Sequence, residues 1–350
     1  MNKTIFLLLT LSLGLGALTG CKKPSSEKPV APANPSQSLQ RVKDPILEEI
    51  YAFRVEIRQA YNNRRFDELE TKAAELRTSK ALFENGTWKI SKFYSALACS
   101  DDEPESMWQL HDRIHQDWIT AKPGSITARV AYADFLARYA WQARGSDYAN
   151  TVKKEGWRLF EERLEAARTV LAQARALPEK DPMWWRVSLT VALGQGWPKP
   201  AYDALVKEAK SAEPGFWEYD TARAYSLLPR WYGEEGDCEA YASEAAENPA
   251  GLGPEIYARI VLNLFGYHQN IFKDSAASWP KTRAGLEQMR QKYPKSLEFL
   301  NCTAMLASLA GDREFAKTSF DALGNTYLPS AWNGDANKFL RCKKWAETGR

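Results

Sequence analysis

Residues 300–323 read LNCTAMLASLAGDREFAKTSFDAL. Apolar or small side chains recur every three or four positions on both sides of the Gly311-Asp312 pair: Leu300, Ala304, Ala307, Ala316, Phe320 and Leu323. This is the spacing of one face of an α-helix, so the segment predicts two helices joined by a tight turn. The small residues allow the two helices to approach closely, and Phe320 fills the space that they leave.

The same pattern resembles the tetratricopeptide repeat, a helical hairpin of about 34 residues. Two weaker matches occur earlier in the chain. One ends in Ala167, Leu171, Ala174 and Pro178, and the other spans residues 184–214. One good match and two degenerate ones imply an irregular array of antiparallel helical hairpins, in which each pair buries a face against its neighbours.

Helical spacing continues through the remainder of the chain. Four apolar stripes begin at Ile46, Phe66, Ile126 and Trp157, the first of them directly after a Pro45 suited to a first helical turn. Strand-like alternation is scarce, and only residues 85–90 are compatible with extended structure. We therefore predict an all-α fold, a tetratricopeptide-like array.

The composition is that of a globular protein. The 350 residues are 44% hydrophobic and 12% aromatic, with an unusually high count of 13 Trp. The 47 Lys+Arg residues against 44 Asp+Glu give a net charge of +3, which excludes a strongly basic nucleic-acid binder. We expect no nucleic-acid partner.

The N-terminus has the pattern of an export signal. Lys3 precedes an apolar run over residues 5–17, which is shorter than the roughly 20 residues that span a bilayer. The run ends in Leu18-Thr19-Gly20-Cys21, which resembles the lipobox of bacterial lipoproteins. The resemblance implies that residues 1–20 are a signal peptide and that Cys21 becomes the lipidated first residue of the mature chain. An ordinary signal peptide with a nearby free cysteine is the alternative.

The residue after the cysteine is Lys22. Inner-membrane lipoproteins of Gram-negative bacteria usually carry Asp at that position, so the resemblance implies anchoring in the outer membrane, facing the periplasm. In a Gram-positive cell the chain would be on the outer face of the plasma membrane. Residues 21–43, rich in Pro and Ser, predict a flexible tether.

The central part resembles an uncharacterised bacterial family, the domain of unknown function numbered four thousand and thirty-four. Three segments carry the resemblance: Trp88-Lys89 with Phe93-Tyr94, residues 140–145 (AWQARG) and residues 227–233 (LLPRWYG). The family-like region is about 83–245, within a predicted helical domain of 44–245. Residues 246–350 are predicted as C-terminal repeats with a capping helix. The resemblance implies no activity.

A metal site is the strongest enzymatic hypothesis. His111 and His115 are separated by one helical turn and can share an ion. A zinc-protease motif would need Glu where this chain has Asp112, and the third histidine, His268, is far away. A helix packing face explains the two histidines better. We therefore expect no enzyme activity, no metal and no cofactor.

Four cysteines follow Cys21. In an oxidising compartment they allow two disulfides. We favour a Cys302–Cys342 bridge at the end of the array, and Cys99–Cys238 less strongly; four buried thiols are the alternative.

Two Trp–Arg pairs are the candidate binding residues. Trp141 and Arg144 are one helical turn apart, and Arg230 and Trp231 are adjacent. Arg stacks on Trp or binds carboxylates, so these residues suit a peptide or an acidic ligand. The competing explanation is aromatic packing between helices, with each Arg capping helix carbonyls. We expect a protein- or peptide-binding or assembly module at the cell envelope. The alternatives are a metal-dependent hydrolase using His111 and His115, and a small-molecule or lipid carrier.

Overall fold

The computed structural model describes residues 39–145 and 151–350. This part of the chain is all-α, as predicted, with two short strands and two single 3-10 turns. None of the helices in these ranges is both long enough and apolar enough to cross a bilayer. The predicted signal peptide and Cys21 lie outside the described residues.

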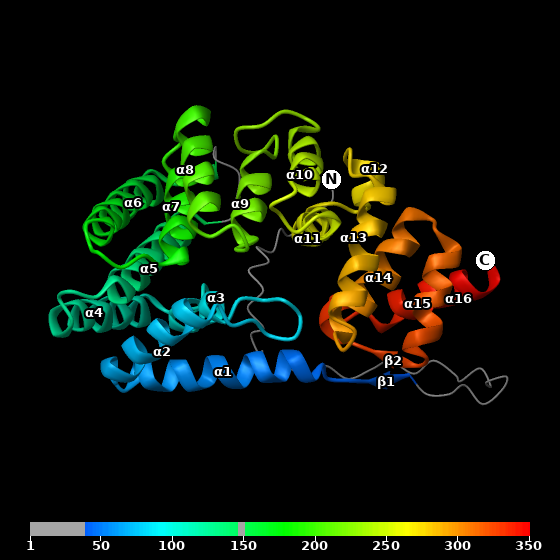
Figure 1. Cartoon of the computed structure of the whole chain (residues 1–350), viewed down its shortest axis with the longest axis horizontal. Helices are drawn as coiled ribbons and strands as arrows, with labels where there is room; N and C mark the ends of the chain where they lie inside the picture. Colours follow the sequence, from blue (N-terminus) through cyan, green and yellow to red (C-terminus); the bar gives the residue numbers. More distant parts are fainter. Residues whose placement is uncertain (1–38, 146–150) are drawn as a thin grey trace.

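The helices follow one another along an arc (Figure 1). The first part contains α1 Pro45–Asn62, α2 Phe66–Ser79, α3 Lys89–Leu97, α4 Glu105–Ala121, α5 Ile126–Arg144, α6 Lys154–Arg175, α7 Pro182–Gly194 and α8 Lys199–Ala212. The second part contains α9 Glu218–Ser226, α10 Asp237–Glu247, α11 Pro254–Leu264, α12 Ile271–Asp274, α13 Trp279–Lys292, α14 Leu297–Ala310, α15 Arg313–Leu323 and α16 Ala336–Thr348. The strands are β1 Gln40–Arg41 and β2 Thr326–Tyr327, and the 3-10 turns are η2 Phe265–Tyr267 and η3 Pro329–Trp332.

The predicted helices form where the apolar stripes place them, and α1 and α5 start with a side-chain cap. Asp44 accepts a hydrogen bond from Ile46 N at 2.8 Å and precedes Pro45 at the first turn of α1. Ser125 caps α5 in the same way through Ala128 N. The predicted stripe of α5 is buried along its length: Ile126, Val130, Ala133, Ala137 and Ala140.

The tetratricopeptide-like segment forms the hairpin α14–α15. Gly311 ends α14 with φ +77°, a conformation that favours glycine. Asp312 then caps α15 by accepting a hydrogen bond from Phe315 N at 3.1 Å. Ala304 and Phe320 are both buried, and they belong to the same hydrophobic cluster.

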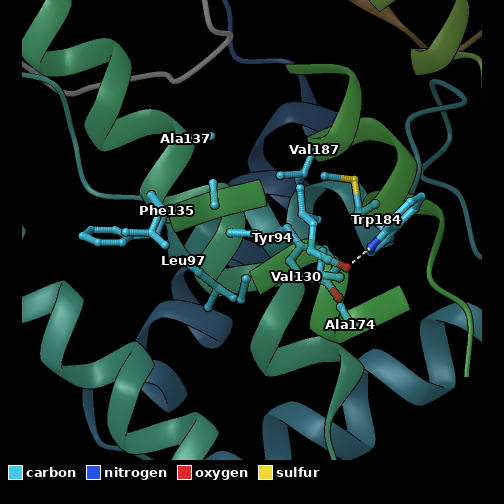
Figure 2. Packing of buried hydrophobic residues seen from close by; sticks show 14 of the residues in the cluster. Tyr94, Leu97, Val130, Phe135, Ala137, Ala174, Trp184 and Val187 are labelled. Atoms are coloured by element: carbon cyan, nitrogen blue, oxygen red, sulfur yellow. Dashed lines mark hydrogen bonds between the residues drawn. The ribbon is translucent and has the colours of Figure 1, made fainter. Parts of the chain in front are cut away.

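Buried hydrophobic residues are found along the whole arc, and they group into separate clusters. The largest extends from Ile57 to Ala222, the second from Ala224 to Leu306, and the third covers the C-terminal helices. Figure 2 shows the first cluster, where Trp184 of α7 donates its indole N–H to Leu171 O of α6 at 2.8 Å. The second cluster crosses residue 245, the predicted boundary between the helical domain and the C-terminal repeats.

The chain ends of the arc are joined by an N-terminal clasp, residues 39–44. β1 pairs in parallel with β2, with Gln40 opposite Thr326 (Figure 1). Asp44 caps α1 and also accepts a hydrogen bond from Glu298 N, at the start of α14, at 2.8 Å. The last residues of the predicted tether, 39–43, are therefore part of the folded body. Their strand partner lies almost 290 residues away, so local composition gave no sign of the pairing.

A central hairpin, residues 82–88, crosses from the N-terminal helices to the second half of the arc. An antiparallel bridge joins Leu82 and Trp88, so the extended structure expected over residues 85–90 is found only in part, and Lys89 and Ile90 instead begin α3. Trp217 Nε1 donates to Gly86 O at 3.0 Å, and Trp88 Nε1 donates to Gly215 O at 3.2 Å. The hairpin thereby fixes the two halves of the array against each other.

Candidate functional site

The four predicted binding residues meet at one place in the fold. Trp141 and Arg144 are on the last turns of α5, and Arg230 and Trp231 are in the loop after α9. The Trp141 and Trp231 rings pack edge to face with centroids 5.5 Å apart. Arg144 lies over Trp141 at 5.5 Å and over Trp231 at 5.9 Å, and Arg230 lies over Trp231 at 5.4 Å.

Sequence analysis did not assign Trp157 of α6 to this group. Arg144 lies over the Trp157 ring at 5.3 Å. Trp157 was expected only as the first member of the α6 apolar stripe. Its incomplete burial, which sets it apart from Phe160 and Leu164 in that stripe, appears only in the structure. We call Trp141, Arg144, Trp157, Arg230 and Trp231 the Trp–Arg surface.

Two glycines allow the surface to assemble. A Cβ on Gly233 would overlap the Leu227 carbonyl, so the loop that carries Arg230 and Trp231 can turn back only with glycine there. A Cβ on Gly194 would lie 2.6 Å from Leu164 Cδ1 and 3.4 Å from the Trp141 ring. These close approaches bring the end of α7 and the loop after α9 against α5 and α6.

The two guanidinium groups differ in their surroundings. Arg144 Nη1 donates to Gly145 O at 3.1 Å, which is the helix-capping role expected of a structural Arg. Burial lowers the pKa of Arg144, and the nearby positive charge of Arg230 lowers it further. Arg230 is exposed, and its guanidinium makes no hydrogen bond or ion pair with residues 39–145 or 151–350.

Trp231 also has an unused donor. Its indole Nε1–H is buried and has no acceptor among the described residues. A buried polar group without a partner is unfavourable, and such groups are uncommon in folded proteins. The surface therefore offers the Arg230 guanidinium as a cationic donor, with no carboxylate of the described chain opposite it.

A pocket of about 670 Å³ adjoins the surface at Trp157. It lies between α6 and the end of α7. Its lining residues are Trp157, Phe160, Glu161, Leu164, Glu165, Arg168, Gly194, Gln195 and Trp197. The turn at residues 193–197, which follows the end of α7 at Gly194, forms one wall.

His111 and His115 of α4 are both buried in the helix packing face. His111 Nε2 is 3.3 Å from Arg58 Nη1, and His111 Nδ1 is 3.3 Å from the Tyr61 hydroxyl. Burial, aided by Arg58, lowers the pKa of His111 to about 4. The Arg58 charge repels any cation at this position, and no third His, Cys, Asp or Glu joins the pair within the described ranges.

The structure contains neither predicted disulfide. Cys99, Cys238, Cys302 and Cys342 are all free thiols. The Cys342 thiol contacts the Ser308 hydroxyl, and Ser308 is six residues beyond Cys302 on α14.

Comparisons of the chain with family models, with curated proteins and with solved structures find no match. The resemblances to lipoproteins and to the uncharacterised family stay predictions. The function is therefore inferred from the geometry of the Trp–Arg surface.

Proposed function

We propose that this protein is a lipid-anchored envelope protein whose helical array binds acidic peptide segments of partner proteins at the Trp–Arg surface. The observation that carries the proposal is the position of Arg230. Its guanidinium is exposed, lies over the Trp231 ring, and has no counter-charge among the described residues. The planar guanidinium can donate two parallel hydrogen bonds to a carboxylate of a bound peptide, while the backbone of that peptide lies across the tryptophan rings.

The aromatic rings supply the apolar part of such an interface. Trp and Arg are enriched at the centres of protein interfaces, where burial strengthens their contacts. Trp141, Trp157 and Trp231 are each half-buried, so part of each ring remains available to a partner.

The anchoring part of the proposal depends on residues 18–22. Acyl chains on Cys21 would hold the protein at the membrane, since each buried CH₂ contributes about 0.8 kcal/mol. Replacement of Cys21 by Ser tests this part. We expect the protein to move from the membrane fraction to the soluble fraction and to lose incorporation of labelled palmitate. Membrane association without palmitate in the unaltered protein would overturn lipid anchoring.

The binding part is tested by in-cell crosslinking of the tagged protein, purification from envelope membranes and mass spectrometry. Arg230→Glu is the informative variant because the side chain is exposed and its guanidinium has no hydrogen bond or ion pair within the described residues to break. Arg113→Glu on α4 is the matched control, because Arg113 is also exposed and makes no hydrogen bond or ion pair with the described residues. We expect partners that are recovered with the control and lost with Arg230→Glu.

Partners that remain bound to Arg230→Glu would overturn the assignment of the surface. The absence of any specific partner at native expression would overturn the binding function itself. Trp231→Ala, checked first for an unchanged melting temperature, provides a second test at the same place.

A further inference from the structure

The pocket beside the Trp–Arg surface has the opposite electrostatic character from the surface itself. Among its charged side chains, Glu165 is already bound by Arg168, with Nη2–Oε1 at 2.6 Å, and by Gln195 Nε2 at 3.2 Å. Glu161 is exposed at the pocket, and its carboxylate makes no hydrogen bond or ion pair with any residue that the structure describes. The pocket thus carries one uncompensated negative charge.

Aromatic rings add to this preference for a cation. Trp157, Phe160 and Trp197 line the same pocket, and the faces of such rings attract ammonium and guanidinium groups. The chain already shows this behaviour at Trp157, where the Arg144 guanidinium lies 5.3 Å from the ring centroid.

The orientation of α7 also favours a cation in the pocket. α7 ends at Gly194, and Gly194 and Gln195 line the pocket. The C-terminal end of a helix carries a partial negative charge, equivalent to roughly half an elementary charge, which favours cations nearby. An unpaired carboxylate, the partly exposed rings of Trp157 and Trp197 and a helix C-terminus therefore all favour a positive charge at one place.

We propose that this pocket, the cation pocket, binds a Lys or Arg side chain of the same peptide whose acidic group binds Arg230. The inference rests on the proposed function and specifies its ligand: a segment with both a basic and an acidic side chain. An aromatic lining favours an organic cation over a bare metal ion, which would need several oxygen ligands. The volume of about 670 Å³ accommodates a long basic side chain with part of its backbone.

The test uses fluorescein-labelled ten-residue peptides that contain one Lys and one Glu at every pairwise spacing in a Gly-Ser background. Anisotropy gives the affinity of each for the unlipidated mature protein. For the tightest peptide, norleucine replaces Lys in one version, because it keeps most of the chain and removes the charge. Gln replaces Glu in another. The protein variants are Glu161→Gln and its neighbour Glu162→Gln, an exposed residue paired with Arg158 outside the pocket.

We expect norleucine to weaken binding roughly tenfold to the unaltered protein and to Glu162→Gln, and much less to Glu161→Gln, because the Lys contact is already reduced there. Equal loss in all three proteins, or no loss in any, would overturn the cation pocket. If the Glu→Gln peptide binds weakly while the norleucine peptide binds normally, the proposed function stands and only this inference fails. If no peptide binds above the Gly-Ser background, both fail.

Discussion

Two regions of this molecule place an arginine over a tryptophan, with opposite consequences. Arg259 is 5% exposed, lies 4.5 Å from the Trp217 ring centroid, and forms an ion pair with Glu255 at 2.7 Å. Arg230 lies 5.4 Å from the Trp231 ring, is exposed, and has no acidic partner in the described part of the chain. The first arrangement is complete within the fold, and the second is not.

The comparison teaches that residue types alone do not separate a structural contact from a binding site. Arg259 also donates to Asn85 O in the central hairpin, so its charge and its donors are used to hold the two halves of the array together. At the Trp–Arg surface the rings are packed, but the Arg230 charge is left for another molecule. The two regions differ in whether the arginine charge has a carboxylate partner within the described fold.

Removal of the buried charge partner should have the largest effect on stability. Glu255→Gln leaves Arg259 buried beside a neutral amide, so we expect the free energy of unfolding to fall by about 3–5 kcal/mol. Urea unfolding followed by circular dichroism measures the change. Glu287→Gln, which breaks the exposed pair with Arg283, is the control and should cost less than about 1 kcal/mol. Equal losses would contradict the distinction between the two environments.

The buried histidines His111 and His115 are a further case, in which the side chain stays neutral because no carboxylate of the described residues lies near enough to balance a positive charge. The folded pKa of His111, about 4, is below the ordinary value of 6.5, so the unfolded chain takes up the proton first. Stability is therefore full above pH 6.5 and falls as the pH decreases toward 4. We expect a loss of about 2 kcal/mol from this residue between pH 6.5 and 5.

His111→Gln provides the check on that pH dependence. Stability curves at several pH values should be flatter for the variant over this interval, although His115, whose pKa burial also lowers, still contributes. An unchanged slope would show that His111 is not the titrating group.

Asp44 represents an intermediate case, a buried carboxylate satisfied by backbone amides at the ends of two helices. Asp44→Ala removes the cap of α1 and the acceptor for Glu298 N, so we expect a loss of about 1–2 kcal/mol. Hydrogen exchange at the β1–β2 pairing should also accelerate. Asp335→Ala, which caps only the more exposed α16, is the comparison and should cost less. Unchanged exchange would show that the clasp is held without Asp44.

The smallest effect on stability is expected at the proposed binding site. Arg230→Ala should lower the free energy of unfolding by no more than about 1 kcal/mol, because the exposed guanidinium loses only its contacts over the Trp231 and Tyr267 rings. Thermal melting measures this directly. A destabilisation similar to that of Glu255→Gln would mean that Arg230 is structural and would remove the basis of the comparison.

The sequence predicted most of the helices because their apolar stripes and caps are local. The stripe from Ile126 to Ala140 and the Gly311-Asp312 turn each depend on residues a few positions apart. Four of the five residues of the Trp–Arg surface were also found, since each Trp–Arg pair is contiguous or one turn apart. Trp157 was missed because its position in the α6 stripe gave it an equally good reason to be core.

The amino-acid sequence by itself determined the all-α class and the approximate positions of the helices, because helix periodicity and capping act within a few residues. Only the tertiary structure decided which helices close the arc, since β1–β2 and the central hairpin join segments far apart in the chain. It also decided that Arg259 finds a carboxylate while Arg230 does not. Charge compensation depends on the partner that folding brings near, and no local pattern contains that information.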